Sequence, residues 1–106
     1  MEQIKELDTV IELCCESQGV KPSDLKTKWK PKEIAFTRQI CWAVLKEIFK
    51  SKYSLDFLGR YVGLNHDHAT VIHACKVISN ERIIKYFDAF YIDLVKDCRD
   101  KLKKVQ

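Results

Sequence analysis

Apolar side chains recur every three or four residues along most of the chain, which is the spacing of one face of an α-helix. The first such segment, residues 2–18, precedes Gly19, a residue suited to end a helix; its apolar positions are Ile4, Leu7, Val10, Ile11 and Cys14. Ser23 is placed to cap one further turn of helix. The basic stretch from Lys26 to Lys32 is most simply a loop.

A second helical pattern begins at residue 33, with apolar positions at Ile34, Ile40, Cys41, Val44, Leu45 and Ile48. Ser54 then has the side chain and position of an N-cap for a short helix that Gly63 would end. Residues 64–66 read as a tight turn, and Asp67 is placed to cap the next helix. The inward positions of that helix are Val71, Cys75 and Ile78.

The last segment, residues 81–104, is long and amphipathic, with one apolar side formed by Ile84, Phe87, Tyr91, Leu94, Val95, Cys98 and Leu102. No stretch alternates apolar and polar residues as a strand does. We therefore predict an all-α domain with a long C-terminal amphipathic helix. An aromatic stripe on that helix either covers the core or offers a face for self-association or for a protein partner; it consists of Tyr86, Phe87, Phe90 and Tyr91.

A short helix, a tight turn and a second helix, over residues 54–79, form the outline of a helix-turn-helix. In this motif the first residues of the second helix face base edges in the major groove of DNA. Histidine can donate or accept there, aspartate accepts from a cytosine amine, and an alanine methyl packs on a thymine methyl. The predicted base-contacting residues are therefore His66, Asp67, His68, Ala69 and Thr70.

The distribution of charge agrees with a nucleic-acid partner. Residues 1–20 hold one lysine and five acidic residues, whereas residues 21–60 hold ten basic and four acidic residues, within a net charge of +4. A basic middle third is expected if one face meets phosphate, although a solvated lysine face gives the same pattern. The 106 residues fit a single domain, residues 1–106.

Composition also limits the cellular setting. No apolar run approaches the length of a membrane span, and the first residues do not resemble a signal peptide. Five cysteines without an export signal indicate reduced, buried thiols. We expect a cytoplasmic, nucleoid-associated protein, with a phage or a mobile element as a candidate source.

Residues 67–76, Asp-His-Ala-Thr-Val-Ile-His-Ala-Cys-Lys, closely resemble a signature of the C-terminal DNA-binding domain of the bacterial replication initiator DnaA. The family typically reads Gly-Gly-Arg-Asp-His-Thr-Thr-Val-Leu-His-Ala-Cys-Arg-Lys. Residues 18–25 are similar to the family's Gly-Val-x-x-x-Asp-Leu segment, residues 37–47 to its Arg-Gln-x-Ala helix, and residues 54–59 to its Ser-Leu-x-x-Ile-Gly sequence. The resemblance covers nearly the whole chain.

The resemblance implies roles for individual residues. Asp67, His68 and Ala69 fall where the family reads bases, and Thr70 lies beside them, where a backbone contact is favoured. Arg38 matches an arginine that contacts the DNA backbone, and Lys30 stands where the family has an arginine that enters the minor groove. Further phosphate neighbours are expected among Lys28, Lys32, Lys46, Lys50 and Lys52.

The chain also departs from the family pattern. Its turn is one residue longer, His66 replaces a basic residue, and Ala69 replaces a frequent threonine, so the preferred DNA sequence is expected to differ. The chain has no Gly-x-x-x-x-Gly-Lys-[Ser/Thr] phosphate loop. We therefore expect a DNA-reading module without ATPase activity, not a complete initiator.

Other kinds of site are disfavoured. His66, His68, His73 and Cys75 lie close together in sequence, but their separations do not place them on one helix face, so no metal site is predicted. No catalytic residues, cofactor, small-molecule substrate or membrane partner are predicted. The function predicted is sequence-specific binding of double-stranded DNA at DnaA-box-like origin or regulatory sites. The alternative is a protein-interaction module of the same fold that binds a replication protein or a second copy of itself.

Overall fold

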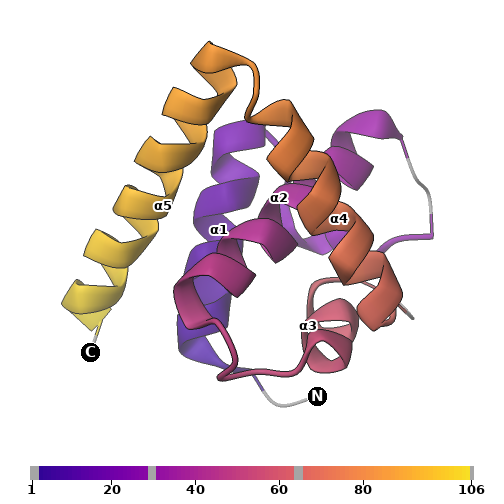
Figure 1. Cartoon of the computed structure of the whole chain (residues 1–106). Coiled ribbons are helices and arrows are strands. Elements are labelled where there is room, and N and C mark those ends of the chain that lie inside the picture. Colours follow the sequence, from indigo (N-terminus) through magenta and orange to yellow (C-terminus); the bar gives the residue numbers. More distant parts are fainter. Residues whose placement is uncertain (1–2, 29–30, 64–65, 106) are drawn as a thin grey trace.

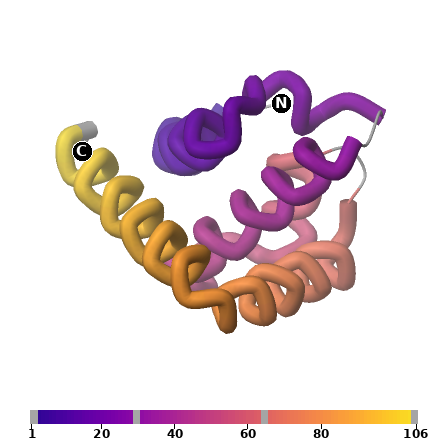
Figure 2. Tube along the Cα trace, turned by 90° about the horizontal axis from the view of Figure 1, so that it is seen from above, coloured from indigo at the N-terminus to yellow at the C-terminus, as the bar shows by residue number. Residues whose placement is uncertain are grey.

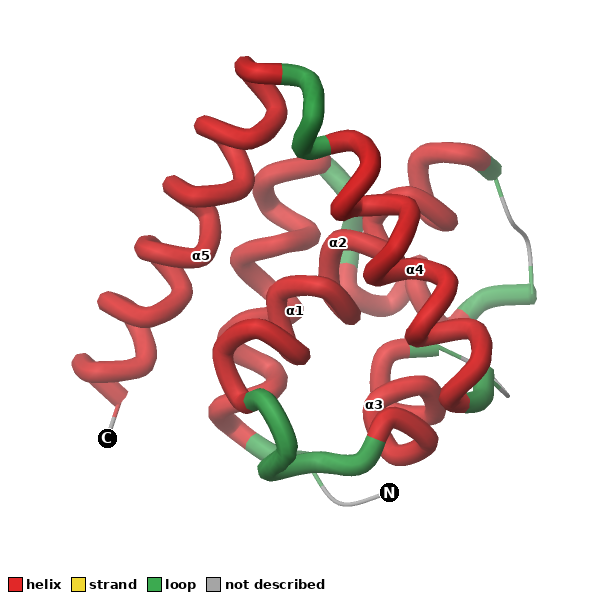
Figure 3. The backbone as a smooth tube through the Cα atoms, viewed as in Figure 1, coloured by secondary structure: helices red, strands yellow, loops and turns green. Residues whose placement is uncertain are grey.

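The computed structural model describes residues 3–28, 31–63 and 66–105. These residues form five α-helices and one short 3-10 helix, and no strand occurs among them, which confirms the all-α prediction (Figures 1 and 3). The elements are α1 (Lys5–Gln18), η1 (Pro22–Lys26), α2 (Lys32–Phe49), α3 (Leu55–Val62), α4 (His68–Glu81) and α5 (Lys85–Val105).

The end of α1 follows the sequence prediction, whereas the cap of η1 differs from it. Gly19 adopts a left-handed conformation with φ 68°, and its N–H donates to the carbonyl groups of Cys15 and Glu16. The prediction that Ser23 caps the next turn was wrong. The N-cap is Lys21, whose backbone N–H donates to the Asp24 carboxylate, because an acidic residue at the third helical position can reach back to the start.

Helix α2 is the central element of the core. Its middle section is buried on nearly all sides because α1, α3 and α4 each pack against it. Figure 1 shows α4 crossing in front of α2, with α3 near the N-terminal end of α4. The most deeply buried core side chains include Leu7, Val10, Leu25, Ile40, Trp42, Val44, Leu45, Leu58, Val62, Val71 and Ile78.

Two polar contacts hold α3 in place against this core. The indole of Trp42, which is 2% exposed, donates from Nε1 to the carbonyl oxygen of Leu58 at 2.9 Å. The hydroxyl of Tyr61 donates to Asp8 Oδ1 at 2.6 Å, which links α3 to α1. Because a buried indole N–H needs an acceptor, Trp42 also fixes the position of α3 along α2.

The boundary between α4 and α5 lies later than the sequence pattern indicated. Helix α4 continues to Glu81, and α5 begins at Lys85. Arg82 lies in the turn between them, with its Nε 2.5 Å from Asp88 Oδ1 and its guanidinium 4.4 Å from the centre of the Tyr91 ring. These contacts turn the chain so that α5 packs along α1, on the side away from α3 (Figure 2).

The aromatic residues of α5 divide between core and surface. Tyr91 is buried, and Phe87 and Phe90 are half-buried, with the Phe87 ring 5.8 Å from the ring of Phe36. Tyr86 is 78% exposed, and the neighbouring Ile83 is 83% exposed. Most of the predicted stripe therefore covers the core, and only its first residue faces solvent.

The cysteines are free thiols. Cys14, Cys15, Cys41 and Cys98 are buried between α1, α2 and α5, and Cys75 is half-buried on α4. A hydrogen bond with Cys14, together with burial, raises the pKa of Cys98, so this thiol stays protonated at neutral pH. Within the described ranges, no helix has the length and apolar content needed to cross a membrane.

Candidate nucleic-acid interface

The turn between α3 and α4 is held close to α3 by glycine. A Cβ atom placed on Gly59 would lie 2.5 Å from the carbonyl oxygen of His66, so the returning backbone occupies the space that any side chain would need. A Cβ on Gly63 would lie 2.4 Å from Cδ2 of the His66 ring. The two glycines therefore leave the room that lets His66 lie directly against α3.

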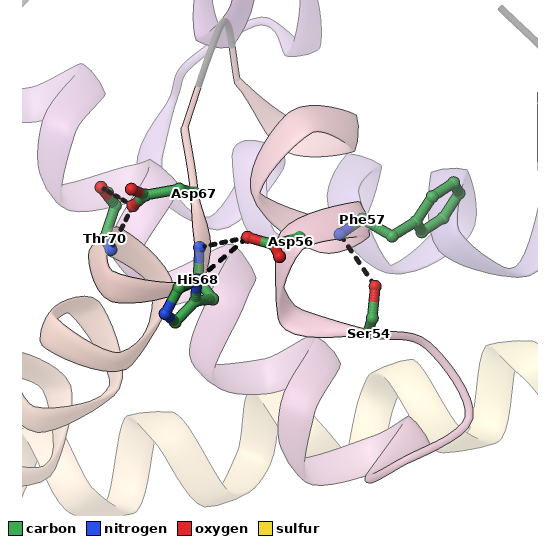
Figure 4. Close-up of polar contacts among 6 residues, drawn as sticks. All are labelled: Ser54, Asp56, Phe57, Asp67, His68 and Thr70. Carbon is green, nitrogen blue, oxygen red and sulfur yellow. Dashed lines mark hydrogen bonds and ion pairs between the residues drawn. The ribbon is translucent and has the colours of Figure 1, made fainter.

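The first turn of α4 is fixed by its cap. Asp67 Oδ1 accepts hydrogen bonds from the backbone N–H of Thr70 at 3.1 Å and from the Thr70 hydroxyl at 3.2 Å (Figure 4). This confirms the prediction that Asp67 is the N-cap. The same bonds hold the pKa of Asp67 below its ordinary value, so the carboxylate is ionised at neutral pH.

The start of α4 is also joined to the start of α3, where Ser54 caps the helix as predicted by accepting from Phe57 N–H at 3.1 Å. Asp56 Oδ1 accepts from the backbone N–H of His68 at 2.8 Å and lies 3.1 Å from His68 Nδ1 (Figure 4). Sequence reasoning did not identify Asp56, because a contact between residues twelve positions apart, across a turn, leaves no local pattern.

Burial separates the two sides of α4. Asp67, His68 and Ala69 are exposed and Thr70 is half-exposed, whereas Val71, Ala74 and Ile78 are buried against α2 and α3. The first turn of the helix is therefore polar and open to solvent, while one apolar side of the helix is anchored in the core; further along, Ile72, His73 and Lys76 are also exposed. Four of the five predicted base-contacting residues share this exposed turn.

His66 is placed differently from the other four. Its ring packs edge-on against the Trp42 indole, with ring centres 5.1 Å apart and an angle of 71° between the planes, and it is half-buried beside Gly63. The His66 ring is thus turned toward α2. A base contact by His66 stays a prediction, and in this conformation its role is packing.

A hollow beside His66 brings in two residues that sequence reasoning did not assign to the interface. It is lined by α2 and α4 and includes Gln39, Thr70 and His73. His73 is exposed and one turn beyond Thr70, and Gln39 is half-buried on the facing helix. Helical spacing could have placed His73 on the same side as Thr70, but no pattern in the sequence pairs either residue with Gln39.

Arg38 is buried, which was not expected of a residue predicted to contact DNA. Its side chain is 3% exposed, and it donates from Nε to the Leu25 carbonyl at 2.8 Å and from Nη2 to the Thr27 carbonyl at 2.7 Å. Burial lowers its pKa from the ordinary value, although a guanidinium stays charged. In this conformation Arg38 fixes the start of the basic loop, and its contact with the DNA backbone stays a prediction.

The predicted phosphate neighbours lie in several places. Lys28, Lys32, Lys46 and Lys50 are exposed. Lys52 forms an ion pair with Glu6 of α1 at 2.7 Å, and Tyr53 donates to the same carboxylate oxygen. Lys30 and Trp29 lie outside the described residues. Among the described part of the chain, no three histidine, cysteine, aspartate or glutamate side chains are grouped to hold a metal ion.

Comparison with known proteins agrees with this geometry. The family described as "Bacterial dnaA protein helix-turn-helix" matches residues 7–78. The chain is similar to "Chromosomal replication initiator protein DnaA" of Bacteroides thetaiotaomicron, with 31% identity over 84 residues, which is 78% of this chain and 17% of that protein. The protein of the same name from Chromobacterium violaceum is 36% identical over 76 residues, which is 72% of this chain and 16% of that protein.

The match therefore spans about a sixth of the length of these relatives. It includes both helices of the 54–79 motif as far as Ile78, together with α2 and most of α1. The chain belongs to the bacterial DnaA helix-turn-helix family, whose fold binds DNA.

Proposed function

We propose that the chain reads double-stranded DNA in a sequence-specific way at sites similar to the boxes bound by the DnaA initiator, and that it does so without hydrolysing ATP. The observation that carries this proposal is the exposed first turn of α4, where Asp67, His68 and Ala69 face solvent on a helix whose other side is buried. This is the end of a helix that can enter a major groove without loss of core packing.

The chemistry of the turn supports direct readout of bases. The ionised Asp67 can accept from a cytosine amine, the His68 ring offers a hydrogen-bonding nitrogen, and the Ala69 methyl can pack on a thymine methyl. Thr70 is held by Asp67, so its hydroxyl is oriented before DNA arrives. Exposed lysines supply attraction to phosphate, which adds affinity without base preference.

The biological role is proposed for these 106 residues, which hold no phosphate loop. A module that reads initiator boxes without a motor would occupy origin-like or regulatory sites. It would compete there with a resident initiator or mark the replication site of the replicon that encodes it. The relatives are named as chromosomal replication initiators, which supports a proposed role at replication-origin DNA.

Fluorescence anisotropy tests the proposal with two labelled duplexes, one carrying an initiator box and one scrambled. The wild-type protein should prefer the box, and the affinity for both duplexes should fall steeply between about 50 mM and about 200 mM salt. His68→Ala should reduce the preference by about tenfold, because one base contact is lost. Lys101→Ala, on the last turns of α5 and far from the motif in sequence, is the matched control and should leave the preference unchanged.

Equal, salt-sensitive affinity for both duplexes would contradict sequence-specific readout at this box. Absence of binding to either duplex would favour the protein-interaction alternative instead. In that case the residues to substitute are the exposed Ile83, in the turn before α5, and Tyr86, in the first turn of α5, and sedimentation velocity would report self-association.

A further inference from the structure

Asp56 lies in the first turn of α3 but makes its contacts on α4. One of its oxygens, Oδ1, accepts from the His68 backbone N–H at 2.8 Å and lies 3.1 Å from Nδ1 of the His68 ring (Figure 4). His68 is the exposed histidine of the α4 turn, with 61% of its side chain accessible. The carboxylate therefore holds both the backbone and the ring of the same residue.

The contact determines which ring nitrogen carries the proton. An ionised carboxylate can only accept hydrogen bonds, so the His68 nitrogen that faces it, Nδ1, must be the donor. In the neutral imidazole the other nitrogen, Nε2, then has a free lone pair and can only accept. The hydrogen bonds from His68 also lower the pKa of Asp56, which keeps the carboxylate ionised at neutral pH.

Electrostatic attraction alone would not restrain the ring. Asp56 and His68 are 51% and 61% exposed, and an exposed ion pair contributes little in water. The restraint comes from geometry. The hydrogen bond with the His68 backbone N–H fixes the carboxylate beside the ring, and the hydrogen bond with Nδ1 then fixes the orientation of the ring. Exclusion of water by a bound duplex would strengthen both hydrogen bonds.

We infer that Asp56 is a positioning residue that sets the base preference of His68 by presenting Nε2 to the major groove as an acceptor. This inference rests on the proposed function. The groove donors that Nε2 can accept from are the amino groups of adenine (N6) and cytosine (N4). Guanine offers only acceptors, N7 and O6, and would face a lone pair. His68 thus selects an amino-bearing base at one position of the site.

The first readout uses the free protein. Long-range ¹H–¹⁵N correlation spectra distinguish the two neutral tautomers of an imidazole, at a pH of about 8 where histidine is neutral. The wild type should show the Nδ1–H form for His68. Asp56→Asn keeps an oxygen acceptor and should retain this form, whereas Asp56→Ala should lose it. His73, which is exposed one turn later on the same helix, is an internal reference that neither variant should alter.

The second readout is base preference. Duplexes are compared in which the amino group is removed from one base at a time, with purine replacing adenine and 2-pyrimidinone replacing cytosine. At one position the wild type and Asp56→Asn should lose about tenfold in affinity when the amino group is absent. Asp56→Ala should lose this discrimination, while the salt dependence of its affinity stays the same. In a His68→Ala background, Asp56→Ala should cause no further change in base preference.

Each outcome has a separate meaning. Specific binding by the wild type, with the same base profile and the same tautomer in Asp56→Ala, would overturn the inference and leave the proposed function intact. Failure of the wild type to bind any duplex would overturn the proposed function together with this inference. Circular dichroism and the Tm of each variant identify any loss of folding, and Asp56→Asn provides the comparison if Asp56→Ala does not fold.

Discussion

At the scale of single residues, the interface depends on close approaches that only particular side chains allow. Gly59 accommodates the returning backbone at His66, and Arg38 fills a buried position by donating to the carbonyl groups of Leu25 and Thr27. Neither residue has to touch DNA to affect binding, because each determines where a neighbouring segment lies.

Gly59→Ala should lower the free energy of unfolding by about 2 kcal/mol, the usual cost of forcing extra volume into a packed site. The added Cβ would meet the carbonyl oxygen of His66 at 2.5 Å, and backbone cannot rotate away as a side chain can. Urea denaturation measures the change. Arg60→Ala, an exposed substitution on the same helix, is the control and should change stability little. Equal stability of the wild type and Gly59→Ala would show that the turn does not pack as described.

Arg38→Met should lower the free energy of unfolding by about 2 kcal/mol, because the buried carbonyl of Leu25 and the partly buried contact to the Thr27 carbonyl lose a charged donor. Arg38→Lys should not restore it fully, since a single ammonium group cannot reproduce the fork of the guanidinium. Urea denaturation measures the contribution of Arg38 to stability, and duplex titration measures its contribution to DNA affinity. Unchanged stability with a large loss of DNA affinity would indicate that Arg38 contacts phosphate directly.

At the scale of elements, the N-cap residues of two helices could be predicted from the sequence. Ser54 and Asp67 cap α3 and α4 as predicted, because capping depends on residues three positions apart. The start of α5 was placed too early, since the apolar spacing continues through the turn at Arg82 and does not reveal the pairing of that residue with Asp88. The burial of Arg38 and the contact of Asp56 with His68 were missed, because both depend on residues brought together by the fold.

The cap of α4 predicts a specific dependence of stability on pH. The pKa of Asp67 is lowered in the folded state from its ordinary value of 3.8, so its contribution to stability is present above about pH 4 and is lost as the pH falls through the lowered pKa. Asp67→Asn keeps a capping oxygen but does not titrate.

The Tm of Asp67→Asn should therefore fall less steeply than that of the wild type between about pH 5 and about pH 2. Glu6 and Asp56 also have lowered pKa values and act in the same direction, but they are present in both proteins, so the difference between the two curves isolates Asp67. Parallel curves from thermal unfolding followed by circular dichroism would exclude the proposed role of the ionised cap.

At the scale of the whole molecule, the acidic α1 and the long α5 pack together, and α5 lies on the side of α1 away from α3 (Figure 2). The exposed first turn of α4, the start of α3 and the exposed lysines near α2 belong to the part of the molecule that the family match covers, which ends at Ile78. The helix-turn-helix over residues 54–79 could be predicted from the sequence, because its residues are contiguous. Where individual lysines lie relative to a duplex depends on the complex and is not encoded in local spacing.

In the proposed function, the first turn of α4 faces DNA. The most direct test is to record the backbone amide NMR spectrum of the ¹⁵N-labelled protein while an initiator-box duplex is added. The largest chemical-shift changes should fall on Asp67–Thr70, with further changes around Ser54–Asp56 and Lys28, and residues of the second half of α5 should change little. Changes concentrated on residues 83–92, with the α4 turn unaffected, would contradict the account and identify the start of α5 as the binding surface.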